Sequence, residues 1–145
     1  MQRIHYRAEW IWRYRGLSKL PFAGGPPNFS DEENRFIAFR KTVEIRGDVS
    51  AAPVHVSADG RYQLFVNGQR IGRGPARSSP ARQCADPYDL APFLRPGRNV
   101  IAALVHSYGR PTSWYELPRW EAARAFGCGG FFLQGDAVTT AGVVC

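Results

Sequence analysis

Alternating apolar and polar positions, with almost no helical periodicity, are the main feature of this sequence. Between residues 35 and 46 the two faces separate, with Ile37, Phe39, Val43 and Ile45 on one and Arg40, Thr42 and Glu44 on the other. A period of two is typical of a strand whose sheet has one buried and one wet face. Lys41 interrupts the apolar row, which places this strand near the edge of its sheet.

An Asn-Gly pair gives the strongest local prediction. Asn67 and Gly68 separate two strand-like runs, residues 62–66 and 69–72. Both residues tolerate the positive φ angles that a two-residue hairpin turn requires. We therefore predict a β-hairpin at this position.

Further apolar runs predict strands at residues 10–14, 54–58, 131–134 and 138–144. The longest run lies within residues 99–108, where Val100 to Val105 is apolar on both faces. This pattern predicts a central strand that is covered on both sides. Asp89 can cap a short helical turn that ends at Pro96-Gly97.

These elements together predict an all-β fold. Short strands, one short helical turn and two long loops, residues 20–34 and 109–127, indicate an antiparallel β-sandwich or jelly roll. The 145 residues fit one domain, large enough to bury a core of its own.

Composition favours a soluble globular protein, with 44% hydrophobic and 21% charged residues. No apolar run approaches the roughly 20 residues that a membrane-spanning helix needs. The charged first residues, 1–7, lead into no apolar signal region, so we expect a cytoplasmic protein.

The net charge of +7 raises the question of nucleic-acid binding. The arginines are spread from Arg3 to Arg124, however, and the longest basic run is Arg40-Lys41. Nucleic-acid arms usually carry blocks of like charge, so a solvated arginine surface is the preferred interpretation. The scattered cysteines and histidines match no metal-ligand spacing, and we expect no metal or organic cofactor.

Several motifs carry a family resemblance. They are residues 57–68, residues 71–77, Asp86-Pro87-Tyr88-Asp89-Leu90 and residues 93–102. This series closely resembles the N-terminal β-sandwich domain of bacterial alpha-L-rhamnosidases, over about residues 8–135. Its middle part is similar to the galactose-binding-like, sugar-binding jelly roll of beta-galactosidase-like enzymes. The stretch Gly72-Arg73-Gly74-Pro75-Ala76-Arg77 favours the rhamnosidases.

The resemblance implies an accessory domain without catalytic residues. In such inverting enzymes the acidic pair lies in a separate helical barrel, further along the chain. We therefore expect residues 1–145 to lack both that catalytic domain, the implied partner, and the last strands of the sandwich. The parent's implied substrate is a rhamnose-containing glycoside. An unpaired sheet edge would favour homo-oligomers.

Six residues of these motifs are interpreted as structural: Asp59, Asn67, Gly68, Asp89, Gly97 and Asn99. We expect Asp86 and Asp89 to cap backbone amides or to pair with Arg73, Arg77 or Arg82. Neither these carboxylates nor the other acidic groups, residues 31–33 and Glu116 with Glu121, form a recognisable catalytic pair.

Candidate binding residues gather in one aromatic loop and beside the hairpin. The loop set is Tyr108, Arg110, Trp114, Tyr115, Glu116 and Trp120, and the hairpin set is Arg73 and Arg77. Aromatic faces stack on sugar rings and charged groups bind hydroxyls. The loop aromatics could instead plug one end of the sandwich or contact a neighbouring domain. A stand-alone carbohydrate-binding module is therefore the first alternative function, and a basic nucleic-acid-binding domain is the second.

Overall fold

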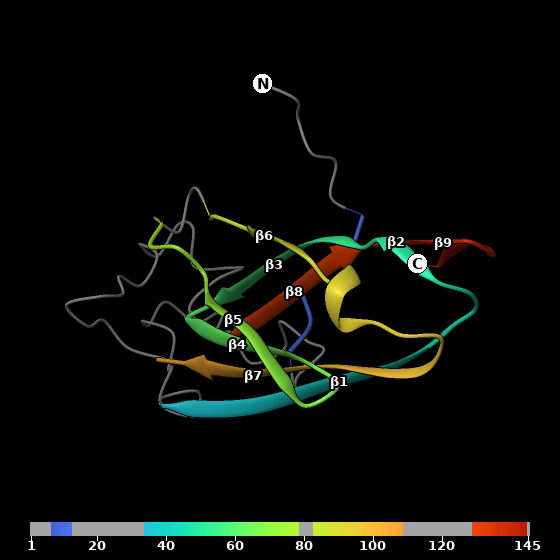
Figure 1. Cartoon of the computed structure of the whole chain (residues 1–145). Coiled ribbons are helices and arrows are strands. Elements are labelled where there is room, and N and C mark those ends of the chain that lie inside the picture. The colour runs from blue at the N-terminus through green and yellow to red at the C-terminus, as the bar shows by residue number, and fades with distance from the viewer. Residues whose placement is uncertain (1–6, 13–33, 79–82, 109–128, 145) are drawn as a thin grey trace, which may run out of the picture.

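The computed structural model of the chain describes residues 7–12, 34–78, 83–108 and 129–144. These residues form strands and one short 3₁₀ helix (Figure 1). The elements are β1 (Arg35–Ile45), β2 (Val49–Ala51), β3 (Pro53–Asp59), β4 (Arg61–Val66), β5 (Gln69–Gly74), β6 (Asp86–Asp89), η3 (Ala91–Phe93), β7 (Gly97–Ser107), β8 (Gly130–Gly135), β9 (Ala137–Thr139) and β10 (Gly142–Val144). No helix among them is long and apolar enough to span a membrane.

The strands form two facing layers, as the sequence predicts for a sandwich (Figure 1). One layer is a four-stranded sheet in the order β1-β7-β4-β5. The other contains two three-stranded sheets, β6-β3-β8 and β10-β9-β2. Only one residue separates β2 from β3 and β8 from β9, so the second layer is one bent surface. All pairings are antiparallel, which confirms the predicted fold class.

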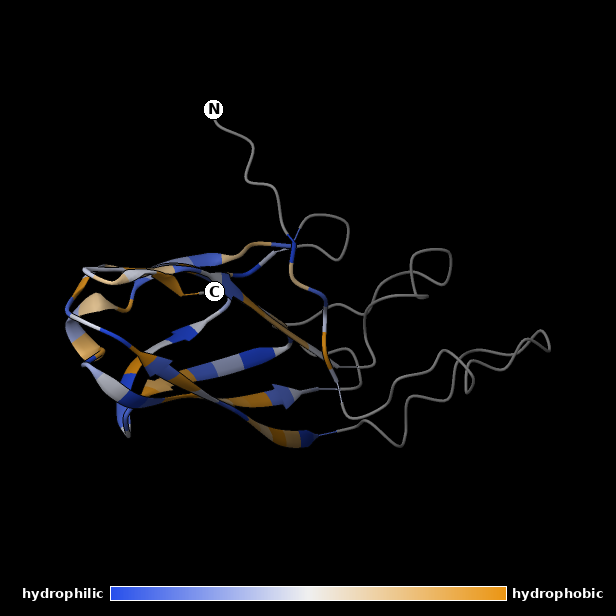
Figure 2. Cartoon of the chain, turned by 90° about the vertical axis from the view of Figure 1, so that its right-hand side faces the viewer, coloured by the Kyte–Doolittle hydropathy of each residue, from blue (hydrophilic) through white to orange (hydrophobic). Residues whose placement is uncertain are grey.

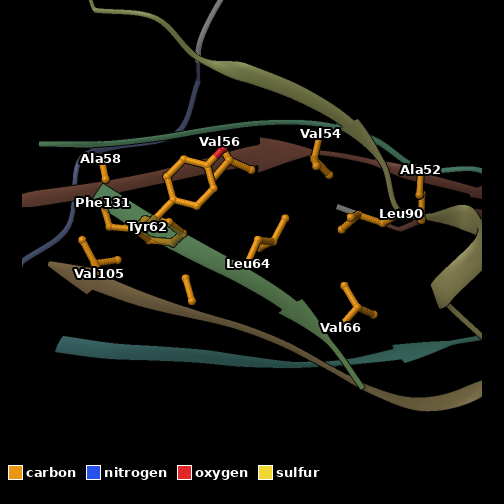
Figure 3. Packing of buried hydrophobic residues seen from close by; sticks show 12 residues of the cluster. Ala52, Val54, Val56, Ala58, Tyr62, Leu64, Val66, Leu90, Val105 and Phe131 are labelled. Atoms are coloured by element: carbon orange, nitrogen blue, oxygen red, sulfur yellow. The ribbon is translucent and has the colours of Figure 1, made fainter. Parts of the chain in front are cut away.

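The core lies between the layers (Figure 3). Alternate residues of β3 and β4 point into it, with contributions from β7, β8 and the turn before η3: Val54, Val56, Ala58, Tyr62, Leu64, Val66, Leu90, Ala103, Val105 and Phe131. Figure 2 shows the corresponding alternation of hydrophobic and hydrophilic positions along the strands. A fully buried side chain such as Leu64 stabilises the fold by about 1.5–3 kcal/mol.

The prediction for residues 35–46 is confirmed. In β1, Ile45 is buried and Ile37, Phe39 and Val43 are half-buried, while Arg40 and Glu44 are exposed. β1 is an outer strand of its sheet. Lys41 lies exposed at an inward position of that strand, an arrangement that disfavours pairing with another chain.

The hairpin prediction is also confirmed. Val66 pairs with Gln69 across a two-residue turn, in which Asn67 has φ 51° and Gly68 has φ 84°. Positive φ at both turn residues defines the mirror-image turn that matches the strand twist. β5 continues to Gly74, two residues beyond the predicted end.

Four predictions need correction. β7 is central, between β1 and β4, but its outward face is not covered by the described residues, and Leu104 is 37% exposed.

Residues 138–144 form two strands, because Thr139 accepts a bond from the Ala141 amide and the chain reverses there. β6 was missed because its sequence, Asp-Pro-Tyr-Asp, is typical of turns. Within the predicted strand 10–14, Ile11 forms a single bridge to Phe131.

The two predicted long loops lie almost wholly outside the described residues. Asn34 is the one residue of these loops that the structure describes.

Candidate functional site

The structure describes three of the eight binding candidates. Arg73 lies exposed in β5, Arg77 follows that strand, and Tyr108 follows β7. The other five lie outside the described residues: Arg110, Trp114, Tyr115, Glu116 and Trp120. The hydrogen-bonded and aromatic side chains near these positions form three clusters. Two of them lie mainly within the fold, and the third is open to solvent.

The first cluster joins β4 to β6. The Tyr62 hydroxyl donates to Asp86 Oδ2 at 2.6 Å and lies 3.1 Å from the Tyr88 hydroxyl. The other Asp86 oxygen, Oδ1, accepts from the Ala76 amide at 3.2 Å. Burial of the Tyr62 ring, followed by the bonds to Asp86 and Tyr88, raises the pKa of its hydroxyl far above its usual value.

Gly74 explains why the stretch 72–77 needs its glycines. A Cβ at Gly74 would lie 1.9 Å from Asp86 Oδ2 and 2.8 Å from the Tyr62 hydroxyl. The glycine therefore leaves space for the bond between those two side chains. Both glycines belong to β5, which ends at Gly74.

Asp89 and Asp86 bind backbone amides rather than arginines. Asp89 Oδ1 accepts from Ala52 N at 2.9 Å and from Ala91 N at 3.0 Å, and these bonds lower the pKa of its carboxyl. Neither aspartate forms an ion pair with Arg73 or Arg77 within the described residues. Asp89 therefore ties the residue before β3 to η3, and Asp86 ties β4 to the chain after β5, while Arg73 and Arg77 are exposed.

The second cluster holds the hairpin against the start of β7. Asn67 Nδ2 donates to Asn99 Oδ1 at 2.8 Å and to Phe93 O at 2.9 Å, while its Oδ1 accepts from Val100 N at 2.9 Å. Asn99, fully buried, bonds Arg95 N, Arg95 O and Gly97 O at 2.6–3.0 Å. Every polar atom of these two amides has a backbone or amide partner.

Asp59, another of the six residues interpreted as structural from the sequence, is buried. Its Oδ2 accepts from the Gly129 amide at 3.2 Å, next to the start of β8.

The third cluster is open and aromatic. His106 stacks on Phe36 with ring centroids 4.2 Å apart and contacts Tyr108 at 4.7 Å. Arg61 Nε donates to the Tyr108 hydroxyl at 3.2 Å, and Asn34 Oδ1 lies 2.9 Å from His106 Nε2. Desolvation under these neighbours lowers the pKa of His106.

Sequence reasoning named Tyr108 but missed Phe36 and His106 as parts of a surface. The available signal was Phe36 itself, an aromatic residue at an otherwise polar, outward position of the strand 35–46. The described residues contain no group of three His, Cys, Asp or Glu side chains that could hold a metal ion.

The fold of the described residues is that of an antiparallel β-sandwich. No protein-family model matches the chain. An alpha-L-rhamnosidase of Formosa agariphila is 28% identical over 95 residues, which cover 61% of this chain and 10% of that protein. A beta-galactosidase of Arthrobacter sp. (strain B7) is 27% identical over 108 residues, 70% of this chain and 10% of that protein.

Solved structures agree with the rhamnosidase side of this comparison. The GH78 family rhamnosidase of Bacillus sp. GL1 matches with TM-score 0.68 and 32% identity, over 99% of this chain and 13% of that one. The alpha-L-rhamnosidase of Aspergillus terreus shares the fold, with TM-score 0.62 and 23% identity, over 79% of this chain and 14% of that one. The chain is therefore homologous to a β-sandwich region of the GH78 alpha-L-rhamnosidases and spans about an eighth of their length.

Proposed function

We propose that the chain is a non-catalytic accessory domain that packs on the catalytic domain of a rhamnosidase-type glycoside hydrolase and flanks its substrate cleft. One observation carries this proposal. Nearly the whole chain, 99%, matches only 13% of the Bacillus sp. GL1 rhamnosidase, at 32% identity. A homologous region within a much larger enzyme supports a role beside that enzyme's other domains.

The bonding of the described carboxylates supports the same conclusion. Glycoside hydrolysis normally needs two carboxyl groups on opposite sides of the scissile bond, one of them able to give a proton. Asp86 and Asp89 accept bonds from Tyr62 and from backbone amides, and Asp59 is buried against Gly129. These three groups are held in hydrogen bonds that stabilise the fold.

The test uses the Bacillus sp. GL1 rhamnosidase in two forms. In the trimmed enzyme the region that matches this chain is deleted, and in the chimera this chain takes its place. We expect the isolated chain to leave an aryl α-L-rhamnoside intact, the trimmed enzyme to lose thermal stability, and the chimera to regain part of it. Hydrolysis by the isolated chain, or a trimmed enzyme as stable as the intact one, would overturn the proposal.

The same samples separate the alternatives. A carbohydrate-binding module should bind L-rhamnose in calorimetry by itself, and Trp114→Ala or Trp120→Ala should abolish that binding. A nucleic-acid-binding domain should bind duplex DNA with an affinity that falls steeply as salt rises. Either result with the isolated chain would replace the accessory-domain proposal.

A further inference from the structure

The outward face of the four-stranded sheet is apolar along its centre. At the centre of β7 the outward positions are Val100, Ala102 and Leu104, between Arg98 and His106 on the same face. Antiparallel sheets with one wet face normally carry polar residues at such positions. A central strand that is apolar on both faces is typical of a sheet buried on both sides.

The neighbouring strands extend this apolar surface. Ala38 of β1 lies opposite Leu104, and Phe65 of β4 lies opposite Ala102. Phe36, 60% exposed and stacked on His106, continues the surface at one end. We call these six residues the apolar stripe: Phe36, Ala38, Phe65, Val100, Ala102 and Leu104.

Arginines surround the apolar stripe. Five lie at outward positions of the same sheet and form the arginine rim: Arg40, Arg61, Arg70, Arg73 and Arg98. Glu44, opposite Arg98, is the one carboxylate that the described strands of this sheet place on this face. None of the five arginines forms an ion pair with a described residue, and Arg61 instead bonds the Tyr108 hydroxyl.

We propose that the apolar stripe and the arginine rim dock onto a second folded domain, whose surface is apolar at its centre and carries carboxylates around it. An apolar centre with a polar rim is the usual anatomy of a protein interface, where arginine is enriched. This inference rests on the proposed function, because the adjoining catalytic domain is then the partner.

Charge complementarity selects this occupant over the others. A second copy of the chain would bring one arginine rim against another, and like charges across an interface are costly. A nucleic acid would pair with the arginines but would leave the apolar stripe without a matching surface. A protein surface with carboxylates around an apolar centre satisfies both features.

The sheet also presents these side chains rigidly. β7 bonds β1 on one side and β4 on the other, so the backbone of the stripe's central strand is paired on both sides. A preformed surface loses little conformational freedom on docking, which preserves affinity.

The test measures binding of the isolated chain to the trimmed Bacillus sp. GL1 enzyme by calorimetry. Leu104→Asp places a charge in the apolar stripe, and the double variant Arg40→Glu/Arg73→Glu reverses two rim charges. Their controls are Val138→Asp, a similarly exposed valine on β9, and Arg95→Glu, an exposed arginine in the loop before β7. We expect each test variant to weaken binding at least about tenfold, and each control to change it less than about twofold.

The outcomes separate this inference from the proposed function. Binding that Leu104→Asp and the rim variant leave unchanged would overturn the inference while the accessory role stands. No binding by the unmodified chain would overturn the proposed function and, with it, the inference.

Three further results would also overturn the inference by assigning the face to another occupant. They are a dimer that Leu104→Asp disperses, duplex DNA binding lost only in the rim variant, and a large fall in the melting temperature of the isolated Leu104→Asp chain. In the last case, residues of the same chain cover the stripe. Leu104→Ser, a milder change, should then lower the melting temperature by a smaller amount.

Discussion

The two faces of β7 differ sharply although they belong to one strand. Inward, Asn99, Ala103, Val105 and Ser107 are buried between the layers. Outward, Val100 and Ala102 are half-buried and Leu104 is exposed, yet all three are as apolar as the core side. The inward face is explained by the stability of this chain. Folding of this chain does not account for the apolar residues of the outward face, and we therefore assign them to docking onto another domain.

The comparison teaches that hydrophobicity and burial carry separate information. An apolar side chain indicates that its position is buried in the functional form of the protein. Its exposed fraction measures how far the described residues alone bury it. Where the two agree, as at Val105, a substitution should affect folding. Where they disagree, as at Leu104, it should affect association more than folding.

The largest effect should come from Asn99→Ala on the inward face. Removing this fully buried amide leaves the Arg95 amide and carbonyl, the Gly97 carbonyl and the Asn67 amide without their partner. Because four hydrogen bonds are lost, each contributing about 0.5–1.5 kcal/mol net, the free energy of unfolding should fall by about 3–5 kcal/mol in urea titrations. The control Gln63→Ala, exposed on the outward face, should stay within about 0.5 kcal/mol. A fall below about 1 kcal/mol for Asn99→Ala would contradict the structural role of this network.

Adjacent residues of β7 give the sharpest comparison of its faces. Val105 is 0% exposed, and Val105→Ala should lower the free energy of unfolding by about 2 kcal/mol through lost burial and a cavity. Leu104→Ala should cost less than about 1 kcal/mol, although it removes more atoms, because the leucine is already in part exposed. Denaturant unfolding of both variants tests the order, and a reversed order would place Leu104 in the core.

Tyr62→Phe should have a smaller effect. The variant keeps the buried ring but removes the hydroxyl that bonds Asp86, so we expect a loss of about 1–2 kcal/mol. The raised pKa of Tyr62 means that the fold keeps this group neutral, so the stability it contributes is present below the unfolded pKa of about 10 and is lost progressively as pH rises above it. The alkaline fall in melting temperature should be weaker in Tyr62→Phe, and an unchanged fall would exclude Tyr62 as its cause.

The smallest effect concerns His106 on the outward face. Its pKa is lowered, so the folded state favours the neutral ring, and stability declines as pH falls below the unfolded value of about 6.5. His106→Gln should remove this part of the acid dependence of the melting temperature. Phe36→Ala, which uncovers the stacked ring, should reduce it. The same acid dependence in all three proteins would contradict the assignment.

Local sequence signals were sufficient for β1 and for the β4–β5 hairpin. The alternation of apolar and polar residues around Phe39 and the turn at Asn67-Gly68 are set by residues close in sequence. The structure has both as predicted. The 138–144 hairpin was hidden because valine and threonine favour strands on either side of a turn at Thr140 and Ala141. β6 forms because β3 offers it a pairing edge, which is a tertiary effect.

The candidate site was less predictable for a related reason. Arg73 and Tyr108 were recognised as residue types that bind, but their position around an apolar surface depends on which strands are neighbours. Phe36 and His106 are 70 residues apart in sequence and meet only because β1 pairs with β7. The sequence shows that residues 100–105 are apolar. It does not show that the described residues leave the outward face of this strand uncovered.

The most direct test of the docking account is a crystal structure of the chimera. We predict that Leu104, 37% exposed in the isolated chain, falls below about 10% exposure against a surface with carboxylates near Arg40 and Arg73. A chimera in which Leu104 keeps its exposure and the enzyme contacts another face of the sandwich would contradict the account.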